Sequence, residues 1–148
     1  MHKGSANYEK TYLLALTALL CTAPLQAEST KSEPVKEFAI VAEFGMIKTV
    51  YMSPDGLKDK NYVARVLHNI VNKHGQRNPI QVMFFDSRRH TPVGIPMTDD
   101  QMLHQRAQYN KNPNTGFEEF VWITVKNSRV SPSDMTHTKA DIRPGYAE

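Results

Sequence analysis

The sequence predicts an α+β fold: a single domain in which two helices pack on a three- to four-stranded sheet. The chain has 148 residues, a length that supports one hydrophobic core. Three stretches, 37–53, 79–86 and 117–125, are rich in β-branched and aromatic residues and have the composition of strands. Apolar residues at helical spacing lie between the first two stretches, and a helix-start signal follows the second. The expected order within residues 37–126 is therefore strand, an optional second strand, helix, strand, helix, strand.

The first 27 residues have the pattern of a secretory signal peptide. Lys3 and Lys10 precede the uncharged run "LLALTALLCTAPL", and Ala27 is a small residue suited to the cleavage position. The run is shorter than the ~20 residues that span a bilayer, so no transmembrane segment is expected in the mature chain. The polar residues 28–36 are expected to form a flexible leader. The protein is therefore predicted to be exported, to the periplasm or the extracellular space.

Cys21 is the single cysteine and lies within the predicted signal peptide. A lipid-anchored form with Cys21 as its first mature residue is an alternative, although Leu20 is bulkier than such processing usually accepts. Cleavage after Ala27 instead leaves a chain without cysteine. That outcome excludes a disulfide scaffold, a thiolate nucleophile and a cysteine-ligated metal.

The net charge is too small to indicate a nucleic-acid partner. The whole chain carries +3, and removal of residues 1–27 with Lys3, Lys10 and Glu9 lowers this value to +2. Proteins that bind nucleic acid mainly through its phosphates present a strongly basic face. Nucleic acid is therefore not an expected partner.

Residues 37–53, "EFAIVAEFGMIKTVYMS", are expected to form one strand or two. Gly45 in their middle accepts the positive φ that either a bulge or a tight hairpin turn requires. The turn sequence "SPDG" at 53–56 is expected to end this part of the sheet.

The clearest predicted helix covers residues 59–75, "DKNYVARVLHNIVNKHG". Asp59 can cap its first turn, and Gly75 suits the left-handed position that ends a helix. Its apolar stripe recurs at the spacing of one helical face and consists of Val63, Val66, Leu67, Ile70 and Val71. The strands that follow, "PIQVMFFD" and "FEEFVWITV", are apolar on both faces, which is typical of strands in the interior of a sheet.

A second helix is expected to begin at Thr98. Thr98 and Gln101 have the spacing of a capping box, and Asp99 and Asp100 fall in the first turn, where the helix dipole stabilises carboxylates. His104 projects about 140° away from Asp99 at 100° per residue, so the two cannot bind one metal ion from this helix. The aspartates are therefore interpreted as a helix start, and no metal site is predicted.

The second helix is expected to end by Tyr109 or Asn110, because "NKNPNTG" is a turn sequence. The segment "YNKNPNTG" is the first candidate recognition loop, since it offers an aromatic ring and several amide groups. Its candidate binding residues are Tyr109, Asn110, Asn112 and Asn114. The competing interpretation is that the asparagines and glycine serve only the backbone of the turn.

The second candidate site is "FFDSRRHTP", which follows a predicted strand at the position where ligands bind in many α/β layers. Arg88, Arg89 and His90 could hold a carboxylate or phosphate group, with Asp86 beside them. In the competing interpretation, Asp86 accepts hydrogen bonds from turn amides while the arginines stay solvated.

The remaining residues, 127–148, lose periodicity and are expected to form a mobile polar tail. The chain contains none of the motifs for a nucleophilic serine, a zinc protease, a P-loop or a dinucleotide site, so no catalytic residue and no cofactor is predicted. The sequence favours a non-catalytic binding or interaction protein of the cell envelope, with an envelope protein or a small anionic ligand as partner. The alternative is a small exported hydrolase that uses Asp86 with a histidine as acid and base. A structure that gathers Asp86, His90 and His104 around one pocket would favour the enzyme.

Overall fold

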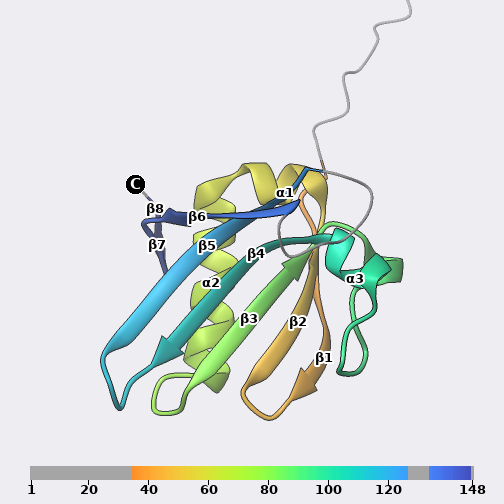
Figure 1. The fold of residues 1–148 in the computed structure, drawn as a ribbon. Coiled ribbons are helices and arrows are strands. Elements are labelled where there is room, and N and C mark those ends of the chain that lie inside the picture. The colour runs from red at the N-terminus through yellow and green to blue at the C-terminus, as the bar shows by residue number, and fades with distance from the viewer. Residues whose placement is uncertain (1–34, 127–133, 148) are drawn as a thin grey trace, which may run out of the picture. The chain divides into compact units, whose positions relative to one another are not determined.

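The computed structural model describes residues 35–126 and 134–147, which form a six-stranded mixed sheet with helices (Figure 1). The predicted signal peptide, most of the predicted leader, and residues 127–133 and 148 lie outside the described residues. The strands follow each other across the sheet in chain order. They are β1 (Phe38–Phe44), β2 (Ile47–Met52), β3 (Ile80–Phe85), β4 (Gln105–Asn112), β5 (Phe117–Val125) and β6 (Met135–Ala140). The predicted sheet of three to four strands with two helices packed on it is therefore wrong.

The opening stretch forms two strands, because Gly45 adopts a φ of 56° and turns the chain between β1 and β2. The two strands pair antiparallel, with a bulge between Ile40 and Ala42. β2 then pairs parallel with β3, whereas β3, β4, β5 and β6 pair antiparallel in succession. A parallel pair needs a crossover, and the helices α1 (Pro54–Lys58) and α2 (Lys60–His74) supply it.

The predicted helix at 59–75 is confirmed as α2. Its start has the expected chemistry, but Gly75 at its end has a φ of −130° and not the left-handed conformation expected there. The carboxylate of Asp59 accepts a hydrogen bond of 3.0 Å from the backbone N–H of Tyr62. The backbone N–H of Gly75 donates to the carbonyl of Val71 at 2.8 Å. The "SPDG" segment, predicted as a turn, forms α1, because the Ser53 hydroxyl accepts a hydrogen bond from Gly56 N and caps this short helix.

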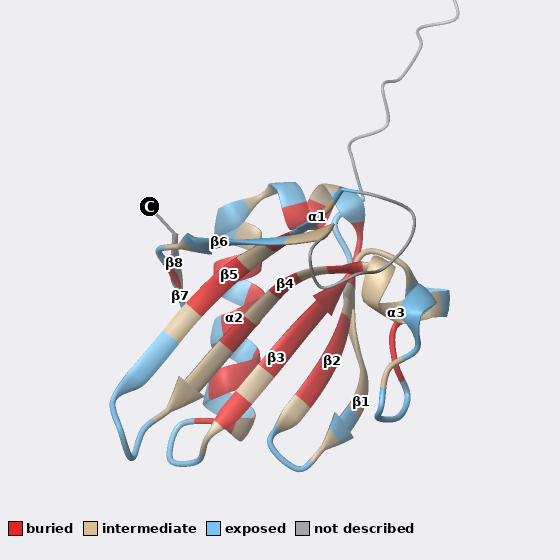
Figure 2. Ribbon diagram, in the orientation of Figure 1, coloured by how far each residue is buried: buried red, intermediate tan, exposed pale blue. Residues whose placement is uncertain are grey.

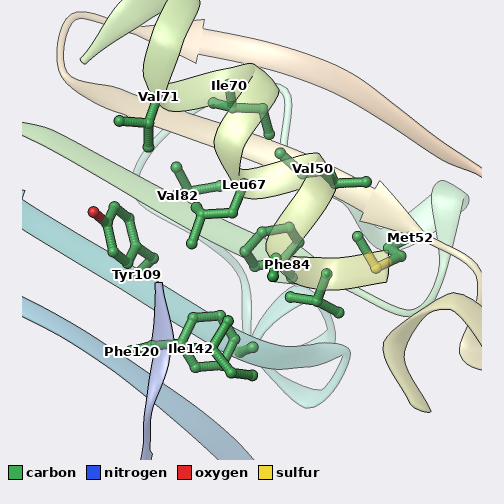
Figure 3. Close-up of a cluster of buried hydrophobic side chains, with 14 of the residues drawn as sticks. Val50, Met52, Leu67, Ile70, Val71, Val82, Phe84, Tyr109, Phe120 and Ile142 are labelled. Carbon is green, nitrogen blue, oxygen red and sulfur yellow. The ribbon is translucent and has the colours of Figure 1, made fainter. Parts of the chain in front are cut away.

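The core lies between α2 and one face of the sheet (Figure 3). Each fully buried aliphatic or aromatic side chain contributes about 1.5–3 kcal/mol to this packing. The principal members are Val50, Met52, Leu67, Ile70, Val71, Val82, Phe84, Tyr109 and Phe120. Leu67, Ile70 and Val71 belong to the apolar stripe predicted for α2. This stripe is the face of the helix that packs against the sheet.

The second predicted helix is mostly wrong. Only α3 (Asp99–Leu103) is helical, and β4 begins two residues later at Gln105. Gln105, Ala107 and Tyr109 are buried while the residues between them are half-buried, which is the two-residue period of a strand. α3 lies at one corner of the sheet, whereas α2 runs behind it (Figure 1). One long helix on one face therefore replaces the expected pair of helices.

The sixth strand falls within the segment predicted to be a polar tail, and residues 134–147 are part of the fold. After β6, the short strands β7 (Ile142–Arg143) and β8 (Tyr146–Ala147) pair with each other and contact α2. Ile142 is buried in the core, and Gly145 N donates a hydrogen bond to the Ala64 carbonyl at 3.0 Å. Among the described residues, no helix has the length and the apolar character needed to cross a lipid bilayer.

Candidate binding site

Asp86, directly after β3, is the centre of a hydrogen-bonded cluster at one end of the sheet. Its Oδ2 forms an ion pair with Nε of Arg106 at 2.6 Å, and its Oδ1 accepts a hydrogen bond from Nδ1 of His104 at 2.8 Å. Its backbone N–H donates to the carbonyl of His104 at 3.1 Å. Both carboxylate oxygens are therefore bonded to side chains of the α3–β4 junction, and charge-assisted bonds of this kind are stronger than neutral ones.

A bulge in the β3–β4 ladder positions Arg106 for this contact. Phe84 pairs with Ala107 but Phe85 pairs with Gln105, so Arg106 is the extra residue opposite them. Bulges commonly redirect a side chain at the end of a sheet. The Arg106 Nη1 atom also donates to the carbonyls of Leu103 and Gln105, at 2.7 and 3.2 Å. Arg106 thus fixes the end of α3, the start of β4 and the end of β3 to one another.

His90 extends the cluster through its ring. The imidazoles of His90 and His104 are stacked, with centroids 4.1 Å apart and planes 10° apart. A hydrogen bond of 2.8 Å joins His90 Nδ1 to the Ser87 hydroxyl, and the Thr91 hydroxyl donates to the Ser87 carbonyl. His90 therefore contacts His104 but not the carboxylate of Asp86. The three residues lie together, but they do not form one hydrogen-bonded relay.

The two arginines predicted to bind anions stand on the 3₁₀ turn 88–90, and both are exposed. The guanidinium carbon of Arg88 lies 6.0 Å from the ring centroid of Tyr51, within cation–π range. Neither arginine lines the pocket that Asp86 borders. Their placement fits the competing interpretation, in which they stay solvated.

A pocket of about 390 Å³ lies next to Asp86. It lies between α1 and the ends of β4 and β5, and it is lined by Pro54, Leu57, Lys58, Asp86, Arg106, Trp122, Ile123 and Thr124. Trp122 is the single tryptophan of the chain. Its ring lies edge-on to that of Phe120, with the ring centroids 5.0 Å apart. Lys58 pairs with Asp55 on the exposed surface of α1 at 3.0 Å.

The residues of the other predicted recognition loop lie at the opposite end of the sheet. Tyr109 is fully buried, and its hydroxyl donates to Glu118 at 2.7 Å, so its ring cannot contact a partner. Burial is the main cause that raises the pKa of Tyr109 far above the ordinary tyrosine value. Asn110 accepts a hydrogen bond from Gln108, and Asn112 accepts one from Asn114 N in the β4–β5 turn. The side chains of Asn110 and Asn112 are therefore engaged in hydrogen bonds within the strand and its turn.

Sequence reasoning placed Asp86 at a strand end and named His90 and His104 as side chains that could join it, but it missed Arg106, Lys58 and Trp122 as neighbours. The bulge that positions Arg106 left no signal in the residue pattern. Within residues 35–126 and 134–147, no three His, Cys, Asp or Glu side chains lie close enough to hold a metal ion. Comparisons of the chain with protein-family models, curated protein sequences and solved structures returned no match.

Proposed function

We propose that the chain is an exported, non-catalytic binding protein of the cell envelope whose pocket beside Asp86 takes a small anionic ligand with an apolar body. The observation that carries this proposal is the position of Arg106. Its Nε is fixed by Asp86 and its Nη1 by backbone carbonyls, while no described residue accepts a hydrogen bond from Nη2. A guanidinium held in this way is ready to donate to a carboxylate or phosphate.

The other pocket residues supply the second half of the argument. Leu57, Trp122 and Ile123 form an apolar wall, and sites for small molecules combine such walls with a few fixed polar groups. Lys58 adds a second cation, and its exposed pair with Asp55 is worth only ~0–1 kcal/mol, so it can turn to a ligand. The negative charge of Asp86 is already offset by the guanidinium of Arg106.

A second function is supported by one contact. The 2.8 Å hydrogen bond from His104 Nδ1 to Asp86 is the arrangement that orients a histidine as a general base through its other ring nitrogen. An exported hydrolase is the alternative that this contact favours.

Trp122 offers a direct test, because fluorescence of the single tryptophan reports occupation of the pocket. The probe is 8-anilinonaphthalene-1-sulfonate, an aromatic anion. We expect saturable quenching of Trp122, and we expect Lys58→Gln to weaken binding about tenfold, because a hydrogen bond to a charged group contributes ~1.5 kcal/mol. Lys60→Gln is the matched control, since Lys60 is exposed two residues further along the chain and is not among the residues that line the pocket.

Equal binding by both lysine variants, or none by the wild type, would contradict the proposal. Hydrolysis of p-nitrophenyl acetate or phosphate by the purified protein separates the two functions. Turnover that disappears in His104→Gln, while probe binding stays unchanged, would establish the enzyme instead.

A further inference from the structure

The two edges of the sheet differ in chemistry. The edge strand β1 reads "FAIVAEF" and carries one charged residue, Glu43, whereas β6 reads "MTHTKA" and exposes threonine, histidine and lysine side chains. Natural sheets protect their edges with charged and polar residues, because unpaired backbone groups on an edge recruit further strands. By that criterion β6 is a protected edge and β1 is not.

Exposed apolar side chains gather around the same edge. Of the six large hydrophobic residues that are exposed in the described part of the chain, four lie on β1 or beside it. They are Val35, Phe38, Val93 and Ile95, while Met46 and Phe117 line one hollow between the β1–β2 and β4–β5 turns. Single exposed hydrophobic residues are ordinary, but a gathered set marks an interaction surface.

The loop that carries Val93 and Ile95 is fixed next to β1. The hydroxyl of Thr49 donates to the Pro92 carbonyl at 2.8 Å and lies 3.4 Å from the Ala42 carbonyl of β1. Pro92 is buried, yet Val93 and Ile95 are 73% and 54% exposed. Figure 2 shows the exposed end of this loop beside β1. Four consecutive exposed residues, "VGIP", have no charge or hydrogen-bonding side chain, a run that surfaces avoid unless it has a function.

We propose that a second copy of this chain pairs with β1, so that two sheets join edge to edge across a two-fold axis. An antiparallel pairing is self-complementary. When it is centred on Val41, Phe38 of one copy faces Phe44 of the other, and Glu43 faces Ala39, so no like charges oppose each other. Glu43 is also held by Lys48 of its own chain at 3.1 Å.

The bulge in β1 shapes this interface. Two residues on a bulged strand oppose one on its neighbour, which shortens the regular ladder available to a partner. A short ladder needs additional apolar contact, and the loop ends at Val93 and Ile95 supply it on one face of the joined sheets. The interface therefore depends on β1 and on the loop together.

Sedimentation equilibrium of the purified protein tests the proposal. We expect a dimer, which Val41→Lys converts to a monomer by placing on β1 the charge that protects other edges. Thr138→Lys puts the same charge on β6 and is the matched control, expected to remain dimeric. The pair Val93→Asp and Ile95→Asp is expected to weaken dimerisation about a hundredfold, whereas Phe117→Asp leaves it unchanged.

Thermal unfolding checks that each variant is folded. If Val41→Lys does not fold, the variant with Val93→Asp and Ile95→Asp tests the dimer in its place. A wild-type protein that stays monomeric at high concentration overturns the proposal. So does a dimer that survives both the Val41 and the loop changes, or one that Thr138→Lys dissociates.

Discussion

Nε2 of His74 lies 3.6 Å from Oε1 of Glu43, and this buried nitrogen has no hydrogen-bond partner among the described residues. His74 ends α2, and Glu43 belongs to β1, where Lys48 already holds its other oxygen at 3.1 Å. The distance is too long for a hydrogen bond. The contact therefore brings together two elements that are far apart in the sequence without satisfying the imidazole.

Because this buried nitrogen has no hydrogen-bond partner among the described residues, an apolar residue at position 74 should make the fold more stable. His74→Leu should raise the free energy of unfolding by about 1–3 kcal/mol, because it removes that nitrogen. Urea denaturation measures the change. His68→Leu is the control, because exposed His68 is bonded to Asn72 at 2.7 Å and should give no gain. A loss of stability in His74→Leu would show that the nitrogen is satisfied in solution.

The pair of Glu43 with Lys48 predicts a specific acid response. The hydrogen bond from Lys48 is the main cause that lowers the pKa of Glu43 below its usual value. A lowered native pKa stabilises the fold above the unfolded value, and this contribution is lost as pH falls through the native one. Stability curves of the wild type and Glu43→Gln, measured by denaturant titration, should therefore approach each other as the pH falls below the ordinary glutamate value of about 4.3. Parallel curves down to pH 2 would contradict this assignment.

The raised pKa of Tyr109 predicts a loss of stability at alkaline pH. Burial and the Glu118 carboxylate raise the pKa of Tyr109, so this group stays protonated when exposed tyrosines ionise near pH 10. A raised native pKa gives stability that is complete below the unfolded value and is lost as pH rises above it. Tyr109→Phe should remove this alkaline loss. Ultraviolet absorbance should show an equal number of ionising tyrosines in both native proteins, and one more in the unfolded wild type.

The Asp86 cluster predicts strong energetic coupling. Asp86→Asn and Arg106→Gln should each cost about 2 kcal/mol, because each leaves a partly buried partner unpaired. The double change should cost roughly 1 kcal/mol less than the sum, or less still, since the effects of two residues that form an ion pair are not additive. Chemical denaturation of the three variants measures the coupling. Additive costs would mean that the two groups do not interact in solution.

The start of α3 predicts a helix-capping effect without a change in binding. The Thr98 hydroxyl accepts from Gln101 N at 3.3 Å, and the Gln101 side chain accepts from Thr98 N at 2.9 Å. Thr98→Ala should cost about 0.5–2 kcal/mol, and Asp99→Asn should cost less. Neither change should affect the fluorescence titration of Trp122. Loss of probe binding in the Asp99 variant would contradict its interpretation as a helix start.

Local signals in the sequence predicted some elements well. Asp59 begins α2 as expected, because it acts through the backbone of its own helix turn. Gly75 also follows the helix, but it is not left-handed, and a Cβ at this position would lie 2.6 Å from Cγ2 of Ile80. The capping box at Thr98 was also predicted and is confirmed, yet it obscured the strand that follows. The alternation of Gln105, Ala107 and Tyr109 favours a strand, and pairing with both neighbours satisfies its backbone.

Longer-range features left weaker signals. The sequence of β6 resembles a polar tail, because an edge strand needs few apolar residues. Its pairing with residues 120–125 of β5 forms only in the folded sheet and leaves no local signal. Asp86 was placed at a strand end from the apolar run before it. Its contact with Arg106 depends on a bulge, and the burial of Tyr109 depends on α2, so neither could be predicted from neighbouring residues.

The parallel pairing of β2 with β3 also has a consequence for the rate of folding. In the described sheet, the antiparallel neighbours are close in sequence except for β3 and β4, while β2 and β3 can meet only after residues 53–79 have crossed over. Closing a long connection has an entropic cost before its contacts form, so this crossover should limit the speed of folding. Shortening an apolar side chain at Leu67, where α2 meets the sheet, is therefore expected to slow refolding. The same truncation at Ile123 in β5 should mainly accelerate unfolding.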